Sequence, residues 1–152
     1  MIRLRDIMQK KVEGISPHDS AEAAWNRMRL LRVRHLVVLE GRRVVGVLSD
    51  RDVAGRGSLR QVEAVGDVMS EPVVSGHPEM TLRQAANRMR GRSIGCLPVM
   101  EGDDLVGIVT TTDLLELLGR GLTRVPVTGR GRPTLATRGP RRKPFVRSSL
   151  RA

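Results

Sequence analysis

The chain of 152 residues has very few aromatic side chains: one Trp, one Phe and no Tyr. Its hydrophobic fraction is nevertheless 39%, so a core has to be built from Val, Leu, Ile, Met and Ala. The length fits one compact domain, or one duplicated domain with a tail, and is too short for two large domains. We therefore expect a modest, aliphatic core.

Paired cysteines and long apolar runs are also missing. The only cysteine is Cys96, which excludes an internal disulfide and a cysteine-rich metal site and favours a reducing, cytoplasmic location. Charges interrupt the N-terminal segment, and no apolar stretch approaches the ~18 residues of a membrane span. We expect neither a secretory signal nor a membrane contact.

Acidic residues are missing from the C-terminal part, although the formal net charge is +11. Residues 1–119 contain 17 Lys and Arg and all 16 Asp and Glu, and residues 120–152 contain the other 10 cations. Residues 1–119, the body of the chain, are thus nearly neutral. The tail is rich in Arg, Gly and Pro without an apolar period, which predicts disorder.

The sequence contains an internal repeat. Residues 6–53 align with residues 67–114 at a constant offset of 61 without a gap, and 16 of the 48 pairs are identical. Chance would give about three identities at average residue frequencies. We expect two copies of one unit, in residues 1–60 and 61–119, followed by the tail at 120–152.

Each copy has one amphipathic helix, predicted by apolar residues at helical spacing: Ala21, Ala24, Trp25 and Met28, then Leu82, Ala85, Ala86 and Met89. Thr81 with Gln84 resembles a capping box, and Asp19 with Glu22 offers a similar start in the first copy. Both helices therefore have a sequence signal at their beginning.

Two β-rich runs follow each helix and predict hairpins, at 35–39 and 43–48 and again at 96–100 and 105–109. A short helix is expected after each hairpin. It is clearest at 111–118, where Gly119 has the position of a C-terminal cap. A further short strand is expected before each main helix, near 12–15 and 73–74, with 54–66 as the linker.

The predicted unit is β-α-β-β-α, and the fold class is α/β (α+β). One such unit of about 50 residues cannot cover its own three-stranded sheet, so a single copy would be marginally stable. We expect the two copies to pack about a pseudo-twofold axis, with two clefts along the seam.

The same motif follows both hairpins: residues 46–52 and 107–113 share the pattern Gly-hydrophobic-hydrophobic-Ser/Thr-x-x-Asp. At a strand-to-helix turn, the carboxylate of Asp52 or Asp113 can accept hydrogen bonds from the vicinal hydroxyls of a ribose. The amides at the helix start can face an anion. A nucleoside ligand is one interpretation of this pattern.

A structural interpretation competes with it. Ser49, Thr110 and Thr111 can cap the helices, and the aspartates can interact with the helix dipoles. This structural interpretation is less favoured because the motif occurs twice in register after matching hairpins. No nucleophile elbow, P-loop or metal-ligand spacing is found, so an enzyme is not expected.

The repeated unit resembles the cystathionine-beta-synthase (CBS) domain, and its tandem arrangement resembles a Bateman module. The resemblance covers about residues 1–118 and is carried by the two Gly-to-Asp motifs, by 5–8 and 66–69 opening the copies, and by 97–99 in the second hairpin. It implies regulation without catalysis and an adenosine-type ligand. AMP, ADP or ATP come first, S-adenosylmethionine and NAD are alternatives, and no cofactor is required.

Carried over by position, the resemblance implies that Asp52 and Asp113 hold ribose hydroxyls, with Ser49 and Thr110 beside them. The base would lie near early strands and pre-hairpin residues, and the candidates there are Ile15, Val33, Val73 and Ile94. The phosphate candidates are Arg34, His35 and Arg51, with Arg32 and Arg92 as less favoured alternatives. In the second copy, Gly95 and Cys96 replace Arg34 and His35, and Thr112 is the candidate in the position of Arg51. We therefore expect one nucleotide site to dominate.

Two functions follow as hypotheses. The first is a ligand sensor, working as a homodimer, that relays adenine nucleotide binding to a regulated partner protein. The second is an interaction protein with vestigial clefts, whose basic tail binds nucleic acid or an acidic partner by counterion release.

Overall fold

The computed structural model describes residues 1–121, so the predicted tail lies outside the described residues except for its first two positions. The helices are α1 (Leu4–Ile7), α2 (Ala21–Leu31), α3 (Asp50–Ala54), η1 (Gly57–Gln61, a 3-10 helix), α4 (Val65–Val68), α5 (Leu82–Arg92) and α6 (Thr111–Gly119). The strands are β1 (Gly14–Ile15), β2 (His35–Glu40), β3 (Arg43–Ser49), β4 (Cys96–Glu101) and β5 (Asp104–Thr110). The predicted α/β class and both predicted hairpins are confirmed.

The two long helices begin with different caps. At α5, the Thr81 hydroxyl accepts the Gln84 N–H at 3.2 Å and Gln84 Oε1 accepts the Thr81 N–H at 2.9 Å, so the predicted capping box is confirmed. The prediction of Asp19 with Glu22 at α2 is wrong. The cap is Ser20, whose hydroxyl accepts the Ala23 N–H at 3.0 Å, because Asp19 accepts the Ser16 N–H in the preceding turn.

The strand expected at 73–74 does not form. In the first copy β1 pairs in parallel with β2, and the Val37 N–H donates to Glu13 O at 3.0 Å. Pro98 occupies the position equivalent to Val37 and has no N–H, so this bond cannot be repeated. A single bridge between Gly76 and Val99 remains.

The end of α6 also differs from the prediction. Gly119 is the last helical residue rather than the cap, and the C-cap is Arg120. The left-handed backbone that favours glycine falls two residues further on, at Gly121, with φ of +77°.

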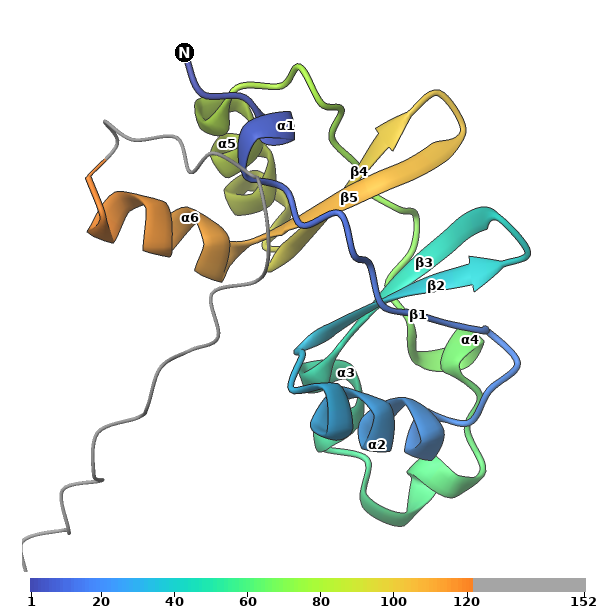
Figure 1. The fold of residues 1–152 in the computed structure, drawn as a ribbon. Helices are drawn as coiled ribbons and strands as arrows, with labels where there is room; N and C mark the ends of the chain where they lie inside the picture. Colours follow the sequence, from blue (N-terminus) through green and yellow to red (C-terminus); the bar gives the residue numbers. More distant parts are fainter. Residues whose placement is uncertain (122–152) are drawn as a thin grey trace, which may run out of the picture.

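The leading segment of each copy, which contains α1 in the first copy and α4 in the second, packs on the other copy. α1 lies beside α5, where the Leu4 N–H donates to Met80 O at 2.9 Å, and α4 lies against α2, where the Val65 N–H donates to Asp19 O at 2.8 Å (Figure 1). Leu4 and Val65 occupy the same position in the repeat, and both are fully buried. The two copies therefore exchange their first helices reciprocally.

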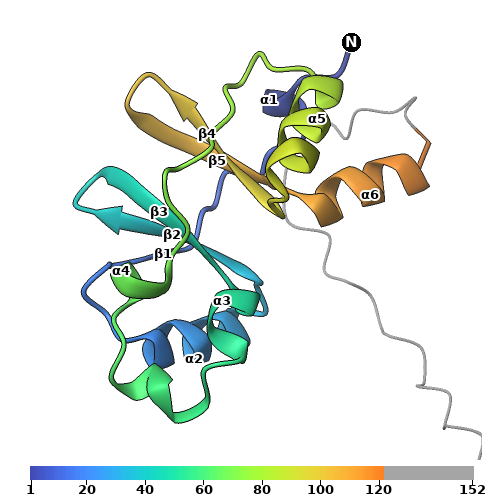
Figure 2. The same cartoon turned by 180° about the vertical axis from the view of Figure 1, so that it is seen from behind.

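We call β1–β3 with α2, α3, η1 and α4 the first unit, and β4–β5 with α1, α5 and α6 the second unit. Seen from either side, the helices of each unit lie to one side of its hairpin, and the two hairpins lie side by side (Figure 1, Figure 2). The matched, exchanged contacts at the constant offset relate the units by an approximate twofold axis.

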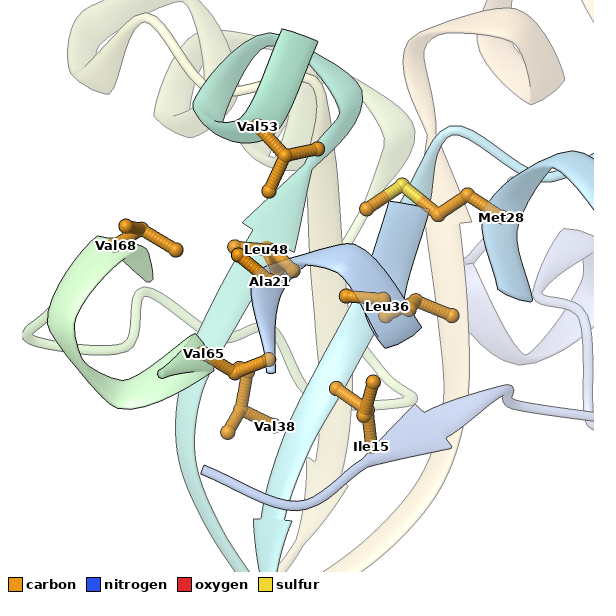
Figure 3. Close-up of a cluster of buried hydrophobic side chains, with 10 residues drawn as sticks. Ile15, Ala21, Met28, Leu36, Val38, Leu48, Val53, Val65 and Val68 are labelled. Atoms are coloured by element: carbon orange, nitrogen blue, oxygen red, sulfur yellow. The ribbon is translucent and has the colours of Figure 1, made fainter. Parts of the chain in front are cut away.

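Three clusters of buried apolar side chains form the core. The cluster of the first unit joins α2, α3 and α4 to one face of its sheet, and Figure 3 shows Val65 of α4 beside Val38 of β2. The cluster of the second unit contains Leu4 together with Met80, Met89 and Leu97. The third cluster lies between the two hairpins and consists of Val37, Cys96 and Ile108, with five partly buried side chains packed against it.

The core is aliphatic, as the composition predicts, and Met28 and Met89 are buried on the inner faces of their helices as predicted. Within the described part of the chain, no helix has the length and apolar character that crossing a bilayer requires.

Candidate ligand-binding site

The two motif aspartates lie at equivalent turns, where β3 leads into α3 and β5 leads into α6. Asp52 Oδ2 accepts the Ser49 N–H at 2.8 Å. Asp113 Oδ2 accepts the Thr110 N–H at 2.8 Å and the Thr110 hydroxyl at 3.0 Å. Each carboxylate thus caps a helix with one oxygen and keeps its second oxygen for another partner.

The two turns differ in the use of that second oxygen. Asp113 Oδ1 accepts a hydrogen bond from Gln9 Nε2 at 2.8 Å. Among residues 1–121, no donor contacts Asp52 Oδ1. In α6 the backbone amide of Asp113 also donates to Thr110 Oγ1 at 3.3 Å. This amide is one of those expected to face an anion at the start of the helix, and it already has a hydrogen-bond partner.

His35 opens β2 and reaches across the seam to the second unit. A Cβ built on Gly95 would lie 2.9 Å from His35 Nε2, so the ring occupies the space that the missing side chain leaves. Burial lowers the pKa of His35 below 6.5, Asp50 and Asp52 oppose this shift, and Arg34 and Arg51 add to it. The ring is therefore neutral at neutral pH.

Cys96 is the counterpart of His35 in the second unit. Its thiol is 3% exposed, and burial, with a smaller effect of the Asp52 carboxylate, raises its pKa to about 12. Cys96 is a core residue of the cluster between the hairpins. The Asp52 carboxylate affects the pKa of both Cys96 and His35, so these three groups lie close together where the two units meet.

The cationic candidates of the first unit also lie at the end of the hairpin where β2 begins and β3 ends. Arg34 and Arg51 are exposed, and both lie close enough to influence the His35 pKa. The Asp50 N–H donates to Arg34 O at 2.9 Å, which joins the residue before β2 to the start of α3. In the second unit the position of Arg51 is taken by Thr112, which is exposed.

The four apolar candidates occupy different environments. Ile15 is 9% exposed and belongs to the core of the first unit, against which Val33 also packs. Ile94 packs on the core of the second unit, and Val73 is half-buried. The side chains of Ile15, Val33 and Ile94 are engaged in packing, so contact of these three residues with a base would go through their backbone.

Two open hollows lie on the surface of the described residues, and the lining of the first includes the candidate Ile15. The first is lined by Gly14, Ile15, Ser16, Asp19, Ala23, Arg27 and Leu39, and the second by Gln84, Asn87, Arg88, Gly91 and Arg92. Neither includes a motif aspartate. Both hollows are wide open to solvent, whereas a small-molecule site encloses most of its ligand, so the repeated turns define the candidate site.

Sequence reasoning missed Gln9. The repeat alignment pairs it with Ser70, but this pairing gives no indication that either residue lies near a motif aspartate. That proximity depends on the exchange of leading segments, which carries Gln9 to β5 and Ser70 to β3.

Comparison with known proteins agrees with this architecture. The family model described as the CBS domain matches twice, at residues 4–57 and 65–120. The chain belongs to the CBS domain family and contains a tandem pair of these domains, which is a regulatory module.

Relatives of two kinds match. The CBS domain-containing protein YhcV of Bacillus subtilis is 33% identical over 134 residues, which cover 82% of this chain and 96% of YhcV. Inosine-5'-monophosphate dehydrogenase of Korarchaeum cryptofilum is 36% identical over 115 residues, which cover 74% of this chain but 23% of the enzyme. The chain thus spans about a quarter of that enzyme's length.

Solved structures share the fold. AcuB from Vibrio cholerae superposes with a TM-score of 0.70 at 29% identity, covering 80% of this chain and 93% of AcuB. CBSX2, solved in complex with AMP, has a TM-score of 0.69 at 22% identity and covers 79% of this chain and 98% of its own. The CBS domain pair of MJ0100, solved with 5'-methylthioadenosine and S-adenosyl-L-methionine, has a TM-score of 0.72 at 22% identity, covering 78% and 97%.

Proposed function

We propose that this CBS pair binds an adenosine-type nucleotide, AMP, ADP or ATP, at the motif turns and relays its presence to a partner protein. The observation that carries the proposal is Asp52 Oδ1, which accepts no hydrogen bond from residues 1–121 and lies near the exposed Arg34 and Arg51. An acceptor for ribose hydroxyls and two cations for phosphate thus lie at one turn. That CBSX2 binds AMP and MJ0100 binds two adenosine derivatives supports this class of ligand.

The packing between the units supports the proposed relay. His35 of the first unit fills the space above Gly95 of the second, so a ligand at the Asp52 turn contacts groups that sense the position of both units. A ligand that binds one arrangement of the units more tightly shifts the population toward it, and a partner can recognise that arrangement. A homodimer and a cytoplasmic location stay predictions.

Titration calorimetry with AMP, ATP, NAD and S-adenosylmethionine tests the proposal. We expect saturable binding of at least one of the first two, weakened about tenfold or more by Asp52→Asn, because a hydrogen bond to a charged group contributes roughly 1.5 to 3 kcal/mol. No binding of any of the four ligands below millimolar concentration would refute it.

Asp6→Asn is the matched control for this substitution. Asp6 accepts the Arg3 N–H at 2.8 Å with the same capping geometry, but it lies in α1, away from the Asp52 turn. Equal weakening by both variants would indicate a general loss of helix capping rather than a ligand contact.

The charge distribution supports a second candidate function, an interaction protein whose basic tail binds nucleic acid or an acidic partner. Residues 120–152 have 10 cations and no acid. Binding of this kind weakens steeply with salt and is lost when residues 120–152 are removed. Salt-dependent binding that survives this truncation would assign it to the folded body instead.

A further inference from the structure

The exchanged leading segments present different side chains to two equivalent carboxylates. Gln9 bridges to β5 through its backbone, with Gln9 N–H to Ile108 O at 2.9 Å and Ile108 N–H to Gln9 O at 3.0 Å. Ser70 bridges to β3 in the same way, with bonds to Val47 of 2.9 Å and 3.2 Å. The backbone holds both side chains in matching places whatever their identity.

The side chains differ in reach. The Gln9 carboxamide extends to Asp113 and donates to Oδ1 at 2.8 Å. Ser70 ends at its hydroxyl, and within residues 1–121 no hydrogen bond joins it to Asp52. Asp113 therefore has both oxygens engaged, one by Thr110 and one by Gln9, whereas Asp52 has one engaged and one open.

We infer that Gln9 is a built-in competitor for the second ribose position, which makes the turn at Asp52 the dominant nucleotide site of the pair. The inference rests on the proposed function and adds to it a residue that decides which site fills first. A ribose diol at Asp113 has to displace the Gln9 amide from a carboxylate, whereas at Asp52 it meets an open oxygen. Losing one hydrogen bond to a charged group corresponds to about tenfold weaker binding.

Gln9 is a specificity-determining residue in this view, and its influence is independent of the cations. Arg34 and Arg51 favour phosphate at the first site through charge, and Gln9 disfavours ribose at the second site through competition. The two effects act in the same direction and are separable by substitution.

Reciprocal substitutions test the inference. Gln9→Ser gives the second turn the side chain of the first, and Ser70→Gln does the reverse; the backbone bridges persist in both. In calorimetric titration with AMP, we expect one strong site in the wild type, removed by Asp52→Asn and kept in Asp113→Asn. Gln9→Ser should strengthen a second site about tenfold, and Asp113→Asn should remove that gain. Ser70→Gln should weaken the first site by a similar factor.

A measurement without ligand tests the contact itself. The side-chain amide resonances of Gln9, observed by ¹⁵N NMR, should shift when Asp113 is replaced by Asn and stay in place in Asp6→Asn. Urea unfolding of the two swap variants checks that they retain the fold, because a loss of affinity in an unfolded variant would carry no information on competition.

The failures are distinguishable. Binding of AMP in the wild type with no change, or a loss, at the second site in Gln9→Ser overturns the role of Gln9 and leaves the proposed function standing. Absence of binding of AMP, ATP, NAD and S-adenosylmethionine in both the wild type and Gln9→Ser refutes the proposed function and the inference with it. An unmoved Gln9 amide in Asp113→Asn overturns the inference directly.

Discussion

At the scale of single residues, one glycine in β3 and one in β5 leave space for side chains from the exchanged segments. A Cβ built on Gly107 would lie 2.7 Å from Met8 Sδ and 3.0 Å from Gln9 O. Met69 meets Gly46 in the equivalent place. The glycine of each motif therefore allows close approach of another backbone rather than a turn, and the same approach brings Gln9 to Asp113.

His35 gives a pH-dependent stability that can be measured. Its folded pKa lies below 6.5 because of burial, so in the window between that lowered pKa and 6.5 the unfolded chain binds more protons than the folded one. Stability therefore falls as the pH falls through this window. His35→Gln should reduce the loss of unfolding free energy seen between about pH 7.5 and 5.5 in urea titrations.

Asn87→Gln provides the control for this substitution, because Asn87 is exposed and its side chain does not titrate. It should keep the pH dependence of the wild type. An unchanged slope in His35→Gln would show that the ring is accessible to protons in the folded protein.

At the scale of elements, the exchange of α1 and α4 makes each short helix part of the other copy's core. Leu4 is fully buried in the core of the second unit, although it belongs to the first copy. Leu4→Ala should lower the free energy of unfolding by about 2 to 5 kcal/mol, as expected for a truncated core leucine. Urea unfolding measures the change.

Leu115→Ala is the matched control, since Leu115 is 62% exposed on α6. It should alter stability by no more than about 0.5 kcal/mol. If the two substitutions had equal effects, α1 would not be docked in that core.

The long helices, the hairpins and the repeat could be predicted because local signals determine them: apolar spacing, the Thr81 cap and the turns at Gly41 and Gly102. The exchange of α1 and α4 could not be predicted from the sequence. The alignment of the two copies is the same whether each helix packs on its own copy or on the other one. The missing strand at 73–74 depends on Pro98, a residue of the partner strand. The candidate site was therefore predicted in its motif residues but not in Gln9.

At the scale of the whole molecule, the units are joined by the exchanged helices and by the cluster between the hairpins. Val37 of the first unit and Cys96 and Ile108 of the second are all buried there. Separating the units exposes this cluster and withdraws α1 and α4 from their cores. Neither unit can unfold alone without exposing apolar surface of the other.

The chain has one natural probe on each side. Trp25 packs on the core of the first unit with the Arg60 guanidinium 4.7 Å from its ring centroid, and Cys96 lies in the cluster between the hairpins. Because the units depend on each other, we expect the urea midpoint from Trp25 fluorescence to coincide with that from Cys96 labelling by a thiol reagent.

The native labelling rate adds a magnitude to this prediction. A thiol that is buried, with a pKa raised to about 12, reacts only when the cluster opens. For a stability of at least about 5 kcal/mol, labelling without urea should be at least about 4,000-fold slower than in the unfolded chain. Labelling of Cys96 at lower urea than the Trp25 transition would show that the seam opens before the first unit unfolds. The seam would then be a hinge between two stable units, and a nucleotide at the Asp52 turn should slow that labelling by holding the hinge closed.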